Sequence, residues 1–138
     1  MKVFRSLQTV VMLGLFSLIG CSGTDNPFPA EAHSSVSANR FKAIIDSNTP
    51  GTVILDIRTP EEYASGHIKG AVNIDFYQPD FRSKLANLDK ALTYLIYCRS
   101  GNRTSVAMSL MEKYGFKRVV NLENGIIEWA QNKYTLER

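Results

Sequence analysis

The chain has 138 residues, 44% of them hydrophobic, and a formal net charge of +3 at neutral pH. That length is enough for one hydrophobic core and therefore for one domain. Loss of Lys2 and Arg5 with an N-terminal leader would lower the charge from +3 to +1. So small a charge argues against a nucleic-acid-binding protein, which usually carries a basic patch, and we expect no nucleic acid among its partners.

The N-terminal segment has the pattern of a secretory signal peptide. Lys2 and Arg5 precede an uncharged apolar stretch of about 13 residues, which is shorter than the roughly 20 that a membrane-spanning helix needs. The stretch ends in Leu18-Ile19-Gly20-Cys21, which resembles the lipobox of bacterial lipoproteins, cut before a cysteine that then carries a diacylglycerol. We therefore predict a lipoprotein signal peptide over residues 1–20, lipidation at Cys21, and attachment to a membrane through the lipid.

A flexible tether is predicted over residues 21–32, because Ser22 to Ala32 is rich in turn-forming residues and has no apolar period. The folded domain is predicted over residues 33–136. Apolar and β-branched runs in it predict strands at Val36, 52–57, 71–74, 92–97 and 118–122. Apolar residues at helical spacing predict helices after Ser37 and Pro60, near Phe81 and Thr104, and around Trp129.

The alternation of strands and helices predicts an α/β fold, with a mostly parallel central sheet and helices on both faces. One helix is predicted to begin near Thr104 and to stop at Gly115. Its buried face is expected to consist of four residues, Val106, Ala107, Leu110 and Tyr114.

The second cysteine of the chain, Cys98, directly follows the predicted strand 92–97 and precedes the helix near Thr104. Backbone N–H groups of such a loop, together with the helix start, favour a negative charge, and Arg99 and Arg103 add two positive charges if they face inward. These effects favour the thiolate and make the sulfur nucleophilic, and the same loop can bind a small anion. A buried structural cysteine is the alternative, but it does not explain the two arginines.

The stretch Cys98-Arg-Ser-Gly-Asn-Arg-Thr104 resembles the active-site loop of the rhodanese family of sulfurtransferases. Residues 55–63 and 66–73 resemble the upstream blocks of that family, and the resemblance extends over residues 35–132. The chain departs from it at Asn124-Gly125, where many members have two glycines. We expect the turn to persist, because asparagine tolerates a left-handed backbone.

The resemblance implies a single rhodanese-like domain and a two-step reaction at Cys98. The thiolate would take the outer sulfur of thiosulfate as a persulfide, sulfite would leave, and a thiol or cyanide would then remove the sulfur. The substrate would be bound by the loop residues Arg99, Ser100, Gly101, Asn102 and Arg103, with the two arginines at its anionic end. The resemblance implies no cofactor and no metal, and we expect a monomer.

The residues upstream of the loop allow more than one interpretation. Asp56 and Arg58 end a predicted strand, where they could reach the substrate or form a buried pair that supports the loop. His67 is expected in a structural turn. Glu61 and Glu62 are expected in a solvated first turn of a helix.

Two other function classes compete with sulfur transfer. Phosphatases and arsenate reductase-like enzymes of related fold have five residues between the cysteine and the arginine, whereas this chain has four, Arg99 to Asn102. A non-catalytic or relay module that binds a partner protein is the second alternative. The lipobox predicts a location outside the cytoplasm, and Ser22 after the lipidated cysteine favours the periplasmic face of an outer membrane.

Overall fold

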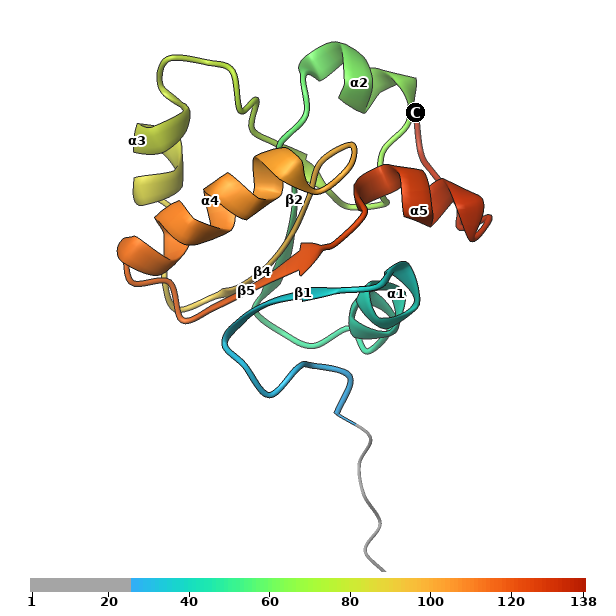
Figure 1. Cartoon of the computed structure of the whole chain (residues 1–138), viewed down its shortest axis with the longest axis horizontal. Helices are drawn as coiled ribbons and strands as arrows, with labels where there is room; N and C mark the ends of the chain where they lie inside the picture. Colours follow the sequence, from blue (N-terminus) through green and yellow to red (C-terminus); the bar gives the residue numbers. More distant parts are fainter. Residues whose placement is uncertain (1–25) are drawn as a thin grey trace, which may run out of the picture.

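The structure is a computed structural model that describes residues 26–138. The predictions for the signal peptide, for Cys21 and for Ser22 lie outside the described residues. Five parallel strands form one sheet in the order β1-β5-β4-β2-β3 (Figure 1). The elements in chain order are β1 (His33–Val36), α1 (Ala38–Asp46), β2 (Thr52–Asp56), α2 (Pro60–Ser65), β3 (Val72–Asn73), α3 (Phe81–Ala86), β4 (Thr93–Tyr97), α4 (Asn102–Lys113), β5 (Arg118–Leu122) and α5 (Gly125–Gln131).

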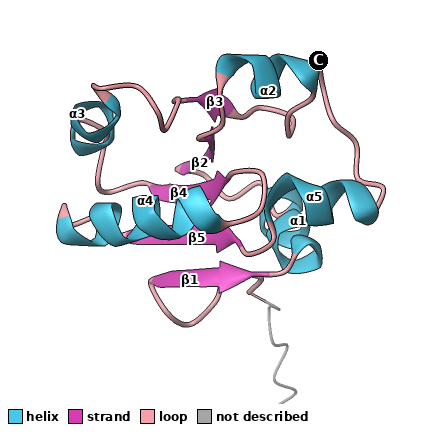
Figure 2. Ribbon diagram, turned by 45° about the horizontal axis from the view of Figure 1, so that its top comes forward, coloured by secondary structure: helices cyan, strands magenta, loops and turns pink. Residues whose placement is uncertain are grey.

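Helices cover both faces of the sheet, as predicted (Figure 2). α1 and α5 lie on one face and α3 and α4 on the other. Side chains of β4 alternate between these two layers: Leu95 and Tyr97 pack with α1 and α5, whereas Tyr94 and Ile96 pack with α3 and α4. A strand buried on both faces needs an almost continuous apolar sequence, and β4 has one. The parallel sheet with helices on both faces confirms the predicted α/β fold.

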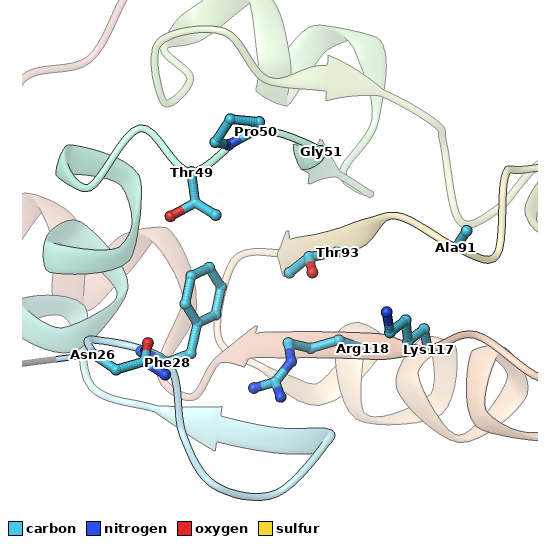
Figure 3. A pocket seen from close by; sticks show the side chains of 9 residues that line it. All are labelled: Asn26, Phe28, Thr49, Pro50, Gly51, Ala91, Thr93, Lys117 and Arg118. Atoms are coloured by element: carbon cyan, nitrogen blue, oxygen red, sulfur yellow. The ribbon is translucent and has the colours of Figure 1, made fainter. Parts of the chain in front are cut away.

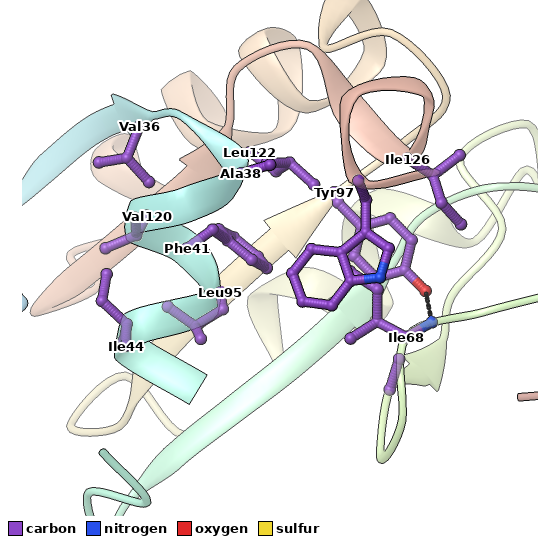
Figure 4. Close-up of a cluster of buried hydrophobic side chains, with 12 residues drawn as sticks. Val36, Ala38, Phe41, Ile44, Ile68, Leu95, Tyr97, Val120, Leu122 and Ile126 are labelled. Carbon is purple, nitrogen blue, oxygen red and sulfur yellow. Dashed lines mark hydrogen bonds between the residues drawn. The ribbon is translucent and has the colours of Figure 1, made fainter. Parts of the chain in front are cut away.

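The layer between the sheet and the helices α1 and α5 is closed by large side chains (Figure 4). Phe41 and Trp129 meet edge to face, with their ring centroids 6.3 Å apart. The Tyr97 hydroxyl accepts a hydrogen bond from the Ile68 N–H at 3.0 Å. That bond joins the end of β4 to the loop before β3, and so fixes the carboxyl edge of the sheet.

The predicted buried face of α4 is wrong in part. The structure buries Thr104, Ala107 and Met111, whereas Val106 is 48% exposed. The three buried residues follow helical spacing from Thr104, which must face Cys98. The cysteine loop, rather than the apolar residues alone, therefore sets the rotation of this helix.

Residues 26–32, called here the N-terminal segment, are ordered on the domain. Arg40 donates hydrogen bonds to the carbonyls of Pro27 and Phe28 at 3.0 and 3.1 Å, and Arg118 donates one to the carbonyl of Pro29 at 2.8 Å. The Phe28 ring also packs against the hydrophobic core. From residue 26 onward the predicted tether therefore lies against the domain in the structure, because guanidinium groups distant in sequence hold its carbonyls.

Candidate active site

Cys98 lies at the carboxyl end of β4, in the short loop that leads into α4. Its side chain is buried, with 1% of the residue exposed. The Sγ atom accepts a hydrogen bond from the Gly101 N–H at 3.1 Å and lies 3.6 Å from the Thr104 hydroxyl oxygen. The loop therefore curls around the sulfur and places hydrogen-bond donors against it.

The first turn of α5 holds the carbonyl groups of this loop. The Ile126 N–H donates to the Cys98 carbonyl at 2.9 Å, and the Ile127 N–H donates to the Arg99 carbonyl at 3.3 Å. The N–H and carbonyl of one peptide point in opposite directions. The bond from α5 to the Arg99 carbonyl therefore leaves the Ser100 N–H, which belongs to the same peptide, on the side of the sulfur.

Two glycines make this close approach possible. Gly101 has a φ of +95°, and a Cβ there would collide with the carbonyl oxygen of Glu123. Gly125 has a φ of +61°, and a Cβ there would collide with the carbonyls of Cys98 and Arg99. Asn124 has a φ of −103°, so the turn persists because Gly125 takes the left-handed conformation, and the predicted reason was wrong.

The pKa of the Cys98 thiol lies below its ordinary value. Burial alone would raise this pKa, but hydrogen bonds from the Thr104 side chain and from the N–H groups of Thr104, Ser100 and Gly101 outweigh it. A lowered pKa was predicted, but partly from the arginine charges. Sequence reasoning missed Thr104 as a partner of the sulfur; its hydroxyl in the first turn of the following helix was the available signal.

Arg103 does not lie open to a substrate. Its guanidinium donates two hydrogen bonds to the carboxylate of Glu62, at 2.8 and 3.0 Å, and lies over the ring of Tyr77. Glu62 also accepts from the Thr59 N–H at 3.1 Å in a capping box at the start of α2. Glu62 is thus half-buried and paired, which corrects its predicted place in a solvated turn, whereas Glu61 is exposed.

The ion pair between these side chains shifts the pKa of both. Hydrogen bonding to Arg103 lowers the pKa of Glu62 to about 2, against the effect of burial. The same hydrogen bond raises the pKa of Arg103. The pair therefore stays charged at ordinary pH and ties α2 to the first turn of α4.

Arg99 has the opposite environment. It is exposed, and within residues 26–138 its side chain makes no hydrogen bond or ion pair. It borders a cleft of about 350 Å³ between α2 and α5, whose apolar wall includes Ile127, Ala130 and Leu136. Ser100 and Asn102 are also exposed, so this side of the loop is the one that a substrate can reach.

Asp56 and Arg58 form a buried ion pair behind the loop. They are 0% and 4% exposed, and the Arg58 Nε and Nη2 atoms lie 2.6 to 3.0 Å from the Asp56 carboxylate. Arg58 also donates to the Gly66 carbonyl at 2.7 Å. The pair therefore supports the chain around the site, and Arg58 also lines the cleft that Arg99 borders.

His67 lies in a structural turn. Its Nδ1 atom is 3.0 Å from the Tyr63 carbonyl oxygen, and its ring stacks on that of Tyr63 with centroids 3.8 Å apart. The backbone of His67 also pairs with Glu137 near the C-terminus.

Within residues 26–138, no group of three or more His, Cys, Asp or Glu side chains could hold a metal ion. In the same part of the chain, no helix has the length and apolar character to cross a membrane.

Known proteins share this fold. A family model described as the rhodanese-like domain matches residues 37–132. The chain is 36% identical over 101 residues to YrkF of Bacillus subtilis, whose name describes a sulfur carrier protein; the match covers 73% of this chain and 53% of YrkF. It is 36% identical over 86 residues to a sulfurtransferase of Allochromatium vinosum, with 62% of this chain and 78% of that protein covered.

A crystal structure of a rhodanese-related protein from Thermoplasma volcanium is similar, with a TM-score of 0.66 and 27% identity over 75% of this chain and 97% of that one. The chain belongs to the rhodanese-like domain family. Together with the sulfurtransferase relatives, this membership supports sulfur transfer as its general chemistry. The chain spans only about half the length of YrkF, 53%, so that protein's complete activity does not carry over.

Proposed function

We propose that the protein is an extracytoplasmic sulfurtransferase that moves a sulfane sulfur from thiosulfate or a persulfide to a thiol or cyanide. The observation that carries this proposal is the position of the Cys98 sulfur, which is held by the Gly101 N–H and close to the Thr104 hydroxyl. These donors stabilise a thiolate before the reaction and a persulfide anion after it.

The reaction balances without an added oxidant or reductant. The Cys98 thiolate attacks the outer sulfur of thiosulfate, the S–S bond of the donor breaks, and its electron pair leaves with sulfite. An acceptor thiolate or cyanide then attacks the outer sulfur of the Cys98 persulfide. The second S–S bond breaks, and the electron pair returns to Cys98 as the thiolate.

The loop residues divide the work of binding. The exposed Arg99 is placed to attract the anionic end of the donor, with Ser100 and Asn102 beside it. Arg103 is a positioning residue in this proposal, because Glu62 occupies its guanidinium. The charges of Arg103 and of the Cys98 thiolate still attract each other, which contributes to the raised pKa of Arg103.

Replacement of the nucleophile tests the proposal. In the assay of sulfur transfer from thiosulfate to cyanide, Cys98→Ser should be inactive with an unchanged thermal unfolding temperature. Mass spectrometry after incubation with thiosulfate should show one added sulfur on the unmodified protein and none on the variant. Transfer that persists in the serine variant would exclude Cys98 as the sulfur carrier.

We also propose that the mature protein is anchored through a lipid on Cys21, at the periplasmic face of an outer membrane. The supporting observations are the apolar leader, the lipobox-like Leu18 to Cys21 and the following Ser22. Expression of the full gene in a bacterium should give a palmitate-labelled protein in the membrane fraction, whereas Cys21→Ala should be unlabelled. If the unmodified protein were as soluble and as free of palmitate as Cys21→Ala, the result would contradict the lipid anchor.

A further inference from the structure

A hollow of about 380 Å³ lies where β4 and β5 begin (Figure 3). Cys98 follows the other end of β4. The walls of the hollow are the start of the N-terminal segment, the turn 49–51 that follows α1, and the first residues of β4 and β5. Thr93 and Arg118 stand two residues before Leu95 and Val120 in their strands. They therefore lie on the same face of the sheet as these two residues, which is the face that α1 covers. Cys98 lies five residues further along from Thr93, roughly 16 Å away.

The hollow combines positive charge with an apolar wall. Among residues 26–138, Lys117 and Arg118 are the only charged residues that line it, and no ion pair in that range uses either of them. The Arg118 guanidinium lies 5.6 Å from the centroid of the Phe28 ring and donates to the Pro29 carbonyl. It is therefore held in place, while most of its five N–H donors remain available to an external anion.

The course of the chain indicates what this end of the domain faces. Asn26 lies on the wall of the hollow, and five residue steps separate it from Cys21. In any conformation those steps span at most about 18 Å. The N-terminal segment is itself fixed by the bonds from Arg40 and Arg118, so it cannot lengthen this reach. A lipid on Cys21 would therefore bring the hollow close to the bilayer surface.

We propose that the hollow, with Lys117 and Arg118, docks on the headgroups of anionic phospholipids. The proposal rests on the lipid anchor at Cys21. Phospholipid phosphates match the two unpaired cations, and Phe28 and Pro50 offer an apolar surface to the adjoining glycerol and acyl carbons. Docking holds the Cys98 loop, at the other end of β4, on the side of the domain that faces away from the membrane.

Energy transfer between the protein and the membrane tests this orientation. A donor fluorophore is placed on the exposed loop through Ser100→Cys in a Cys98→Ser background, and the acylated protein is reconstituted in vesicles that carry acceptor-labelled headgroups. On phosphatidylglycerol vesicles the docked protein should show low transfer. Lys117→Glu changes the charge by two and should lower the ratio of docked to undocked protein about 25-fold, which raises the transfer.

Lys133→Asp is the matched control, because it reverses an exposed lysine after α5 at a position of positive φ, which aspartate tolerates. It should leave the transfer unchanged, and vesicles of phosphatidylcholine alone should reproduce the Lys117→Glu result. Flotation of each sample reports the anchor separately. A protein that does not float refutes the anchor and the docking surface together.

A protein that floats but gives equal transfer on both vesicles, or equal transfer with and without Lys117→Glu, refutes the docking surface and leaves the anchor in place. Millimolar inorganic phosphate that raises the transfer as much as Lys117→Glu does would show that the hollow takes free phosphate. That result would also overturn the assignment to a lipid headgroup. None of these outcomes depends on whether the protein transfers sulfur.

Discussion

The Cys98 loop has two sides that are built in different ways. On the inner side, Gly101 and Thr104 are buried and contact the sulfur, and Gly125 allows the loop to pack on α5. On the outer side, the side chains of Arg99 and Ser100 are exposed, and neither makes a hydrogen bond within residues 26–138, although their backbone is held. Close packing thus determines which residues can stand on the inner side, whereas the outer side is accessible to solvent and to a substrate.

This difference separates reactivity from recognition. The lowered pKa of Cys98 comes from hydrogen bonds of the inner side, after the opposing effect of burial. Of the two loop arginines, Arg103 is bound to Glu62, and only Arg99 is free on the outer side. Substitutions on the inner side should therefore change stability and the pH dependence, and those on the outer side should change substrate affinity.

The largest effect is expected from Gly125→Ala. The added methyl group would collide with the carbonyls of Cys98 and Arg99, and the φ of +61° disfavours alanine as well. We expect a loss of about 3 kcal/mol in the free energy of unfolding, measured by denaturant titration, and a loss of most sulfur transfer. Gly70→Ala is the control: its φ is +77° with no atom within 4 Å, so it should cost only about 1 kcal/mol. Equal losses would show that the contact with the loop is not limiting.

Thr104→Val tests the inner side without a change of shape. The variant lacks the hydroxyl that lowers the pKa of Cys98, so this pKa should rise and the acid limb of kcat/KM should move to higher pH. At acidic pH the rate should fall about tenfold, with a smaller loss at high pH, where the thiol ionises in both proteins. The Thr104 hydroxyl also donates to the Gly101 carbonyl at 3.0 Å, and the Ser105 hydroxyl donates to the same carbonyl at 2.9 Å without contacting the sulfur. Ser105→Ala should therefore leave the pH profile in place. A profile that shifts equally in both variants would contradict the role of Thr104.

Glu62→Gln tests the link between α2 and α4. The folded-state pKa of Glu62 is about 2, below its ordinary value of 4.5, so the carboxylate contributes stability that is fully present above pH 4.5 and lost as the pH falls towards 2. The variant should be less stable than the unmodified protein by about 1 kcal/mol at neutral pH, and the difference should disappear in acid. Thermal unfolding across this pH range measures it. A difference that does not depend on pH would argue against the ion pair.

The sequence was informative where side chains must be buried on both sides. The nearly unbroken apolar run before Cys98 could only form an inner strand, and its alternation with helices led to the α/β fold. The rotation of α4 was not predictable in this way, because Thr104 occupies a buried position for the sake of the sulfur. Thr104 is polar, so a prediction that assigns the apolar residues of a helix to its buried face does not include it.

The site was predictable as far as the loop that carries it. Cys98 and its neighbours stand together in the sequence, but the partner of Arg103 is 41 residues away, on α2. Glu62 has the sequence pattern of an ordinary capping box, and nothing in that pattern indicates a second bond. The fixed N-terminal segment was missed for the same reason, since Arg118 reaches it across 89 residues.

The smallest effect is expected on the outer side, from Arg99→Ala. Arg99 is exposed and unpaired in the described structure, so its removal should leave the thermal unfolding temperature unchanged. We expect the KM for thiosulfate to rise about fivefold with little change in kcat, because one exposed charge that attracts a dianion contributes about 1 kcal/mol. The effect should shrink with added salt, which screens the same attraction. Arg82→Ala, which removes an exposed arginine on α3, should change neither constant. If Arg99→Ala lowered kcat and left KM unchanged, Arg99 would act on the reacting sulfur, and the division between the two sides of the loop would be wrong.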